Sequence, residues 1–406
     1  MTILVLAGGA DQIAFIQELR KFECRIILVD YFQNPPAKPF ADKHIVASTL
    51  DVEAVLKIAK DENVDLVTTA CTDQALLTVA QVSEILNLPC YISYKTALNV
   101  TNKSYMKRIL SENNIPTAKY AIVKSCNESI LQDFTYPLVV KPVDCNSSKG
   151  VRKIVNKCML NDALQQALDY SRTHSAVVEE FKEGEELSVD CYVTDGIVKL
   201  LSVTSSKKIR NTSSFTILQS YYPVVNVEDE DKILKIAQQI ASAFELKNTP
   251  LLVQMIQNPE GLFVLEFSAR MGGGSKYKLI EVLSGVNIMS VYTDLILGNN
   301  VLVQPHKCVN YASMNYVYCN KGILSRIENF DVLKDEHVID EYFLYKTCGM
   351  TIDKAETSSD RAAGFLITSS TYDDMMRKLK KADELIHVLD ESGTDIMKHG
   401  LYFNEQ

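Results

Sequence analysis

The first 100 residues alternate short apolar runs with amphipathic stretches. The runs ILVLAG, RIILVD, HIVAS and LVTTA have the length and apolar character of strands, and the stretches after Ala10, Asp51 and Asp73 have the three-to-four spacing of helices. Asp51 is predicted to be the N-cap of its helix, because its side chain precedes the first apolar turn. This alternation predicts parallel β-α-β crossovers.

The pattern changes at Thr101. A helix is predicted over NKSYMKRILSENN, and two more over about residues 160–173 and 229–245. The segment LSVDCYVTDGIVKLLSVTSSK predicts two antiparallel strands that turn at Asp195-Gly196, and LLVQMIQNPEGLFVLEFSAR predicts a second hairpin. Residues from about 301 onward have the pattern of a smaller α+β region.

Composition and charge narrow the classes of function. The chain has 406 residues, of which 47% are hydrophobic and 23% charged, which is typical of a globular protein of two or three subdomains. A net charge of -9 argues against a nucleic-acid partner. The N-terminal TILVLAGG has the pattern of a strand rather than a signal peptide, and we find no apolar run of about 18 residues, so a membrane span is not predicted and a cytoplasmic location is expected. The ten cysteines form no C-x-x-C pair, so neither a disulfide framework nor a zinc site is predicted from them.

A glycine pair follows the first predicted strand. A dinucleotide-binding fingerprint, G-x-G-x-x-G, starting at Gly8 would need glycines where Ala10 and Ile13 stand. A tight β-α turn is therefore favoured over a direct ligand contact at Gly8 and Gly9.

Charged residues in a fixed order between Lys103 and Arg270 carry the candidate chemistry. Lys103 begins a helix, and Lys141 ends the apolar strand YPLVV, where a lysine can place its charge on nucleotide phosphates. The small-residue segment DCNSSKGV follows and can offer backbone N–H groups to a phosphate. Taken alone, Lys141 is more typical of a solvated strand end, and the acids of VVEEFKEGEELSVD are more typical of a protein surface. The ordered series is more specific than any of its members.

The second predicted hairpin carries polar residues that can bind a metal ion and a phosphate. Residues two apart on a strand share a face, so Glu266, Ser268 and Arg270 are predicted to point the same way, with Gln254 on the partner strand. One carboxylate and two neutral oxygens suit Mg²⁺, and an arginine beside them suits a phosphate or a carboxylate. An acid inside the apolar FVLEFSA is unfavourable unless it is paired or binds a metal.

Three segments resemble, in order and spacing, the three signature segments of the ATP-grasp superfamily. They are PLVVKPVDCNSSKGV, VVEEFKEGEELSVD and LLVQMIQNPEGLFVLEFSARMGGG. The segment EFSARMGGGSKYKLIEVLSGVN is similar to its carbamoyl-phosphate-synthase-like and L-amino-acid-ligase branches. The resemblance implies a fold of mixed α/β and α+β class. It implies an N-terminal parallel α/β (pre-ATP-grasp) domain over residues 1–100, an ATP-grasp domain over 101–300 with a small lid at about 115–180, and a C-terminal α+β region over 301–406 that completes the substrate side.

The resemblance also implies a role for each residue of the series. Positions that contact the ATP phosphates, or cover them as a mobile loop, are matched by Lys103, Lys141, Ser147, Ser148, Lys149 and Gly150. Positions around the adenine and ribose are matched by Glu179, Glu180, Phe181, Lys182 and Glu186. Ligands of one or two Mg²⁺ ions, which Mn²⁺ can replace, are matched by Gln254, Glu266 and Ser268. Arg270 matches the clamp on the phosphate or the intermediate, and Arg270 and Lys141 are the expected catalytic residues. Because Gln254 and Ser268 are neutral, one metal ion is favoured over two.

The implied activity is that of an ATP-dependent carboxylate–amine ligase. Such an enzyme forms an amide or peptide bond through an acyl phosphate and releases ADP and phosphate; its substrates are amino-acid-like, and homodimers occur among its relatives. Two alternatives stay open: a carboxylase acting through carboxyphosphate, and a nucleotide-binding subunit without catalysis. Substrate contacts are expected from the following residues: Gly272 to Gly274, Lys276 or Tyr277, the tract with Lys207, Lys208 and Arg210 (equally compatible with an exposed loop), and Arg361.

Overall fold

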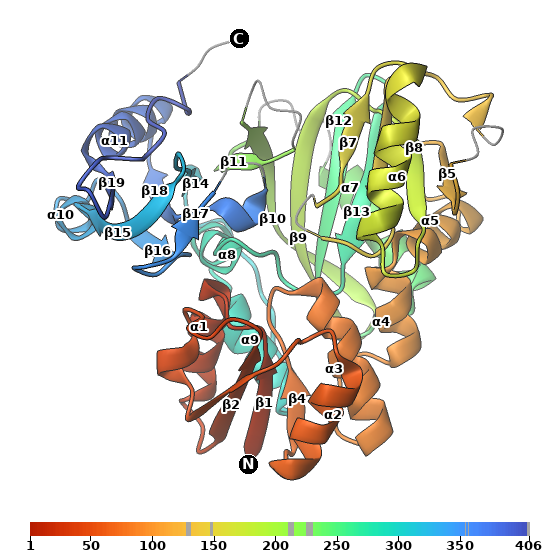
Figure 1. The fold of residues 1–406 in the computed structure, drawn as a ribbon, viewed down its shortest axis with the longest axis horizontal. Helices are drawn as coiled ribbons and strands as arrows, with labels where there is room; N and C mark the ends of the chain where they lie inside the picture. Colours follow the sequence, from red (N-terminus) through yellow and green to blue (C-terminus); the bar gives the residue numbers. More distant parts are fainter. Residues whose placement is uncertain are drawn as a thin grey trace.

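A computed structural model describes residues 1–126, 131–146, 149–209, 215–224, 230–353, 355 and 357–403. The strands form four sheets, and the helices pack against them (Figure 1). In Figure 1 the N-terminal part lies at the bottom, the C-terminal part at the upper left and the segment around β6 to β8 at the upper right.

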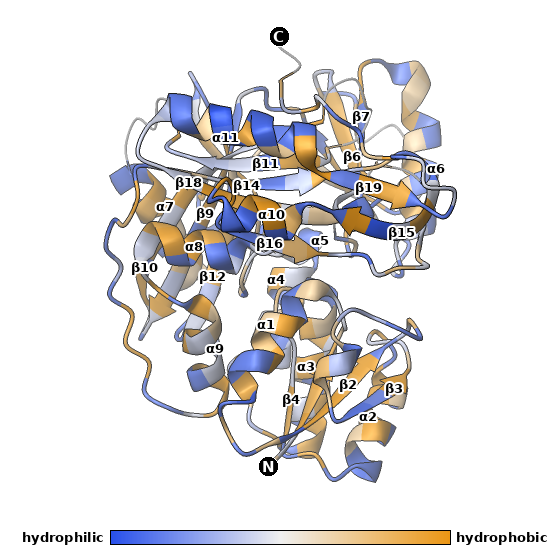
Figure 2. Ribbon diagram, turned by 90° about the vertical axis from the view of Figure 1, so that its left-hand side faces the viewer, coloured by the Kyte–Doolittle hydropathy of each residue, from blue (hydrophilic) through white to orange (hydrophobic). Residues whose placement is uncertain are grey.

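The N-terminal part is a parallel sheet flanked by helices. Its strands, in the order β3-β2-β1-β4, are β1 (Thr2–Leu6), β2 (Arg25–Asp30), β3 (Lys43–Val46) and β4 (Leu66–Thr68). Its helices are α1 (Ala10–Leu19), α2 (Val52–Asp61) and α3 (Asp73–Leu86). The apolar strands lie between helices whose polar faces point outward (Figure 2). The predicted β-α-β order is confirmed, and so is the N-cap, since the Asp51 carboxylate accepts from the Ala54 N–H at 3.0 Å.

Two helices lead from this sheet to a small antiparallel one. The helices are α4 (Tyr94–Thr101), which the sequence did not predict, and α5 (Lys103–Glu112). The small sheet, which we call the lid, has the order β5-β8-β6-β7, with β5 (Tyr120–Val123), β6 (Leu138–Pro142), β7 (Arg152–Ile154) and β8 (Ala176–Glu180). Helix α6 (Leu160–Tyr170) covers one face and buries Leu164 against Leu138 and Val178.

The large sheet is antiparallel and runs in the order β13-β12-β9-β10-β11-β14-β18-β16. Its strands are β9 (Glu185–Thr194), β10 (Ile197–Lys208), β11 (Ile217–Tyr222), β12 (Thr249–Asn258), β13 (Gly261–Ser268), β14 (Tyr311–Val317), β16 (Glu341–Leu344) and β18 (Ala363–Ser369). The predicted turn at Asp195-Gly196 joins β9 to β10, and both residues have positive φ, as an Asp-Gly hairpin turn requires.

The remaining elements surround this sheet. They are α7 (Glu230–Ala243), α8 (Lys276–Ser284), α9 (Ile288–Ile296), α10 (Phe330–Asp335), α11 (Tyr372–Leu385), β15 (Gly322–Glu328), β17 (Thr351–Ile352) and β19 (His387–Asp390), with short 3-10 turns at Lys38–Phe40, Lys157–Met159 and Ser358–Asp360. Because β11 pairs with β14, strands β14, β18 and β16 of the C-terminal region extend the large sheet, while β17, β15 and β19 form a separate three-stranded sheet. No single helix in the described ranges is long and apolar enough to cross a membrane, although α8 and α9 together, bent by 107°, reach the required length and composition.

Candidate active site

A cavity lies between the lid and the large sheet and brings together most of the predicted residues. Of these it is lined by Lys103, Lys141, Glu179, Glu180, Phe181, Lys182, Glu186, Gln254 and Glu266. We call it the nucleotide cavity. Ser268 and Arg270 line an adjoining cavity, which we call the substrate cavity. Lys103, Gln254 and Glu266 line both cavities, so the two meet at the predicted metal ligands.

The predicted loop over the phosphates is described only in part. Ser147 and Ser148 lie outside the described residues. Lys149 and Gly150 follow in the turn after β6 and line neither cavity. Gly150 has φ +71, and a Cβ there would lie 2.9 Å from the ring of Pro142, so the turn depends on glycine at this position.

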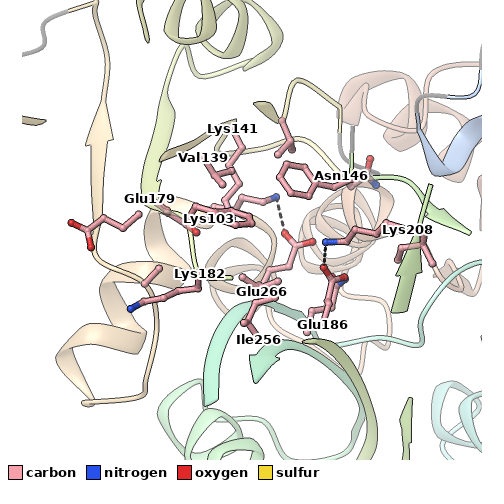
Figure 3. A pocket seen from close by; sticks show the side chains of 18 of the residues that line it. Lys103, Val139, Lys141, Asn146, Glu179, Lys182, Glu186, Lys208, Ile256 and Glu266 are labelled. Atoms are coloured by element: carbon pink, nitrogen blue, oxygen red, sulfur yellow. Dashed lines mark hydrogen bonds and ion pairs between the residues drawn. The ribbon is translucent and has the colours of Figure 1, made fainter. Parts of the chain in front are cut away.

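Two lysines and two acids line a polar wall of the nucleotide cavity, and a third lysine is buried behind them. Lys103 Nζ lies 3.3 Å from Glu266 Oε2 (Figure 3). It also donates to the Cys145 carbonyl at 2.7 Å. Lys141 Nζ lies 3.0 Å from Glu179 Oε1, and the same oxygen lies 3.2 Å from Lys107 Nζ. Lys107 was not predicted; its side chain is fully buried and also donates to Thr117 Oγ1 at 2.6 Å.

Burial and neighbouring charges shift the pKa values of Lys107 and of the two acids. Burial lowers the pKa of Lys107 to about 8, against the opposing attraction of Glu179. For Glu179 and Glu266 burial is the largest effect and raises the pKa, but the neighbouring lysines together outweigh it. The pKa of Glu179 is therefore lowered, and that of Glu266 falls to about 2. Both carboxylates are thus ionised near neutral pH.

The predicted metal ligands lie on the β12–β13 hairpin. Gln254 is directly opposite Glu266 in the strand register, and Ser268 follows two residues later on the same strand. The side chain of Glu266 is 38% exposed, toward the cavity that it lines. An ionised carboxylate with an amide and a hydroxyl oxygen on the same face is a donor set that fits Mg²⁺.

Apolar side chains also line the nucleotide cavity. Val139, Ile256 and Leu265 line it. Lys153 Nζ lies 3.6 Å from the centre of the Phe181 ring. The Glu180 carboxylate accepts from the Thr135 N–H at 3.1 Å, so it is held by the lid.

Glu186 is paired with a lysine across this cavity. Its Oε2 lies 2.5 Å from Lys208 Nζ, as Figure 3 shows, and its Oε1 accepts from Gln254 Nε2 at 3.5 Å. Lys208 therefore belongs to the nucleotide cavity and not to the substrate side. Of the rest of the basic tract, Lys207 Nζ donates to the Tyr402 carbonyl at 2.5 Å and lines neither cavity, and Arg210 lies outside the described residues.

The substrate cavity contains two arginines with different partners. The Arg270 guanidinium pairs with both carboxylate oxygens of Asp73, at the start of α3, with Nε to Oδ1 at 2.8 Å. Arg361 is 7% exposed and stacks on Tyr316, its Cζ lying 3.5 Å from the ring centre. It donates to Tyr318 Oη at 3.2 Å and to Ser358 Oγ at 3.3 Å. Like Lys107, Asp73 was not predicted from the sequence to be a site residue.

Some of the other residues expected to contact the substrate line the substrate cavity, and one does not. Gly272 to Gly274 and Lys276 line the substrate cavity, whereas Tyr277 lines neither cavity and its ring packs near Phe343, 6.0 Å between centres. Near the N-terminus, a Cβ on Gly8 would lie 2.6 Å from Pro35, so this glycine allows a close turn. Gly9 lines the substrate cavity, which the preference for a simple turn did not anticipate.

Fold and site together define an enzyme of the ATP-grasp class. Residues 134–278 match the ATP-grasp domain family. The chain therefore contains an ATP-grasp domain and is an enzyme of the ATP-grasp ligase type. The predicted resemblance and fold class are thereby confirmed.

The chain is 22% identical over 320 residues to the phosphoribosylamine–glycine ligase of Pyrococcus furiosus, a match that covers 73% of this chain and 72% of the relative. An L-amino acid ligase from Bacillus licheniformis has a similar structure, with a TM-score of 0.79, 20% identity and coverage of 96% of this chain and 98% of that one. The biotin carboxylase domain of the Hydrogenobacter thermophilus 2-oxoglutarate carboxylase, solved with MgADP, ADP and bicarbonate, matches with a TM-score of 0.78 and 15% identity, covering 98% and 92%. The similarity to these two solved structures shows that the chain shares their fold.

Proposed function

We propose that the chain joins a carboxylate to an amine, forming an amide or peptide bond through an acyl phosphate, with ATP converted to ADP and phosphate. The observation that carries this proposal is the pair of joined cavities, with Glu266 where they meet. Lys103 and Lys141 supply positive charge on the nucleotide side, and Arg361 supplies it on the substrate side. A carboxylate held by Arg361 would therefore face the γ-phosphate of a nucleotide held by the lysines.

The surroundings of Arg361 favour an anionic substrate group. Among the residues that the structure describes, no carboxylate forms an ion pair with Arg361, whose hydrogen bonds go to the hydroxyls of Tyr318 and Ser358. A buried guanidinium is stabilised by hydrogen bonds to a carboxylate, so a bound substrate carboxylate would be favourable beside Arg361. The Tyr316 ring, 3.5 Å from Arg361 Cζ, adds a cation–π contact that helps to hold the guanidinium in place.

A carboxylate in the same cavity favours an ammonium group. Asp11 accepts from the N–H groups of Gly274 at 2.9 Å and Ser275 at 2.7 Å, which leaves lone pairs on both oxygens. Burial raises the pKa of Asp11, so a cation beside it would favour its ionised form. Opposite charges on Asp11 and Arg361 in one cavity support amino-acid-like substrates.

The proposed reaction has two steps. A substrate carboxylate oxygen attacks the γ-phosphorus and ADP leaves, giving an acyl phosphate. The amine nitrogen then attacks the acyl carbon, phosphate leaves, and the amine loses a proton to water. Lys103 and Lys141 hold the negative charge of the phosphates in place during the first step. Gln254, Glu266 and Ser268 would hold Mg²⁺, which when bound neutralises phosphate charge.

The test is a phosphate-release assay with ATP, Mg²⁺ and L-amino acids, offered singly and in pairs. We expect release that depends on a particular pair, with a product whose mass equals the two substrates less one water. Hydroxylamine added with the carboxylate substrate alone should give the hydroxamate, because it intercepts an acyl phosphate. Release that requires bicarbonate would point to a carboxylase, and ATP binding without release on any substrate would point to a nucleotide-binding subunit.

A further inference from the structure

Two histidines and an aspartate come together on the surface of the C-terminal region, away from both cavities. His387 lies on β19, and Asp395 and His399 lie in the segment that follows it. His387 Nδ1 is 2.7 Å from Asp395 Oδ2, and His399 Nε2 is 3.0 Å from the same oxygen. One nitrogen or oxygen from each of the three side chains lies within 4.8 Å of the other two.

Backbone groups fix the orientation of two of these side chains. The Asp383 carbonyl lies 2.6 Å from His399 Nδ1, and a carbonyl only accepts, so Nδ1 carries the proton. In the neutral ring Nε2 is then a lone pair directed at a carboxylate oxygen. Asp395 Oδ1 accepts from the N–H groups of Val388 at 3.1 Å and Met397 at 3.0 Å, so Oδ2 is the oxygen left for the two histidines.

Two lone-pair-bearing atoms facing each other at 3.0 Å require a positive charge between or on them. Either His399 takes a second proton or a cation is bound. A histidine whose Nδ1–H is held by a backbone carbonyl, and whose Nε2 faces a carboxylate, has the orientation that metal-binding histidines commonly show. The three side chains are 28% to 39% exposed, so an ion has access to the site and a coordination position open to water.

We propose that His387, Asp395 and His399 bind one divalent transition-metal ion, and that Zn²⁺ matches their ligand preferences. Two imidazole nitrogens and one carboxylate oxygen are ligands that Zn²⁺ accepts, with water in the fourth position. Donor atoms around tetrahedral Zn²⁺ lie roughly 3.3 Å apart, so the two nitrogen–oxygen distances of 2.7 and 3.0 Å must lengthen by roughly 0.3 to 0.6 Å.

The bound ion would join β19 to the C-terminal segment. Ile396 N–H donates to the Val388 carbonyl at 2.8 Å, and Lys398 N–H donates to the Tyr318 carbonyl at 2.9 Å, so the backbone here is already positioned. Because folding has ordered this segment before the ion arrives, little further ordering opposes binding. We therefore expect the site to be structural, with no part in the reaction of the two cavities.

The test is titration of the full chain with Zn²⁺ by calorimetry, comparing wild type, His399→Gln and the control His337→Asn. His337 is exposed and has φ +54, a conformation that asparagine tolerates. The cysteines and the active site are the same in all three proteins, so a difference in bound Zn²⁺ isolates this cluster. We expect His399→Gln to lose one tight equivalent, or to bind it at least about tenfold more weakly, while His337→Asn keeps it.

Thermal unfolding gives a second readout. Zn²⁺ should raise the Tm of the wild type more than that of His399→Gln. Equal numbers of tight equivalents in wild type and His399→Gln, or no tight equivalent in the wild type, would overturn the proposal. If His399→Gln does not fold, His387→Asn takes its place, because that side chain is 39% exposed.

Discussion

Replacing Lys107 by methionine should change how the stability of the protein depends on pH. The Lys107 ammonium is buried beside Glu179, and burial lowers its pKa from 10.5 to about 8. Below about pH 8 both the folded and the unfolded protein carry this proton, and holding it in the folded protein costs about 3 kcal/mol. As the pH rises through the folded-state pKa, the folded protein releases the proton while the unfolded protein keeps it, so the free energy of unfolding increases.

The size of the effect follows from these two pKa values. Between about pH 7 and pH 9.5, the free energy of unfolding of the wild type should gain about 2 kcal/mol from this one group. Methionine has a similar length and no charge, and Glu179 keeps Lys141 as its partner at 3.0 Å. Lys107→Met should therefore lack this gain, while groups elsewhere titrate in the same way in both proteins.

Urea unfolding followed by circular dichroism at the two pH values measures the difference, because the chain has no tryptophan for fluorescence. The expected result is that the stability of the wild type relative to Lys107→Met is about 2 kcal/mol greater at the higher pH. If the difference between the two proteins is the same at both pH values, Lys107 titrates normally, and the description of a strained buried charge beneath the nucleotide cavity is wrong.

Three further substitutions test the active site by steady-state kinetics of phosphate release. Glu266→Gln should lower kcat by at least about a thousandfold without changing the Tm by more than a few degrees, because it removes the one charged ligand of the proposed Mg²⁺ site. Arg361→Gln should raise the KM of the carboxylate substrate about tenfold to a hundredfold and leave the KM of ATP unchanged, since a charged hydrogen bond contributes about 1.5–3 kcal/mol. Asp73→Asn should lower kcat/KM about tenfold or more, because Arg270 loses the carboxylate that orients it.

For each of these substitutions, one outcome would contradict the prediction. Phosphate release at the wild-type rate in Glu266→Gln would remove the metal site from the hairpin. If Arg361→Gln raises the KM of ATP as much as that of the carboxylate substrate, this arginine stabilises the structure and does not bind the substrate. Unchanged kinetics in Asp73→Asn would show that Arg270 holds its position without Asp73.

Local patterns predicted much of the fold and part of the site. The N-cap at Asp51 depends on residues three positions away, and the placement of Gln254 opposite Glu266 depends on a short turn and a period of two. Both kinds of information are contained in a few consecutive residues. The same is true of the parallel β-α-β connections of the first 100 residues, since they follow from the alternation of short apolar runs with amphipathic stretches.

Contacts between distant segments were not predictable in this way. Asp73 and Arg270 are 197 residues apart, and their ion pair exists only because the start of α3 faces the end of the β12–β13 hairpin. Lys107 follows the polar pattern of an exposed helix position, yet tertiary packing buries it completely against Glu179. The pairing of β11 with β14, which extends the large sheet into the C-terminal region, likewise leaves no local signal in either strand.

The junction between Lys107 and Glu179 limits how the lid can move. Glu179 belongs to lid strand β8, whereas Lys107 belongs to helix α5, which is outside the lid. Pulling the lid away from the body at this point would break a buried ion pair, which is unfavourable. A lid motion that keeps the Lys107–Glu179 contact, such as rotation about it, is therefore favoured over one that breaks it. The far edge of the lid, at β7, would sweep the widest arc, while Lys141, close to the pivot, would barely change its position.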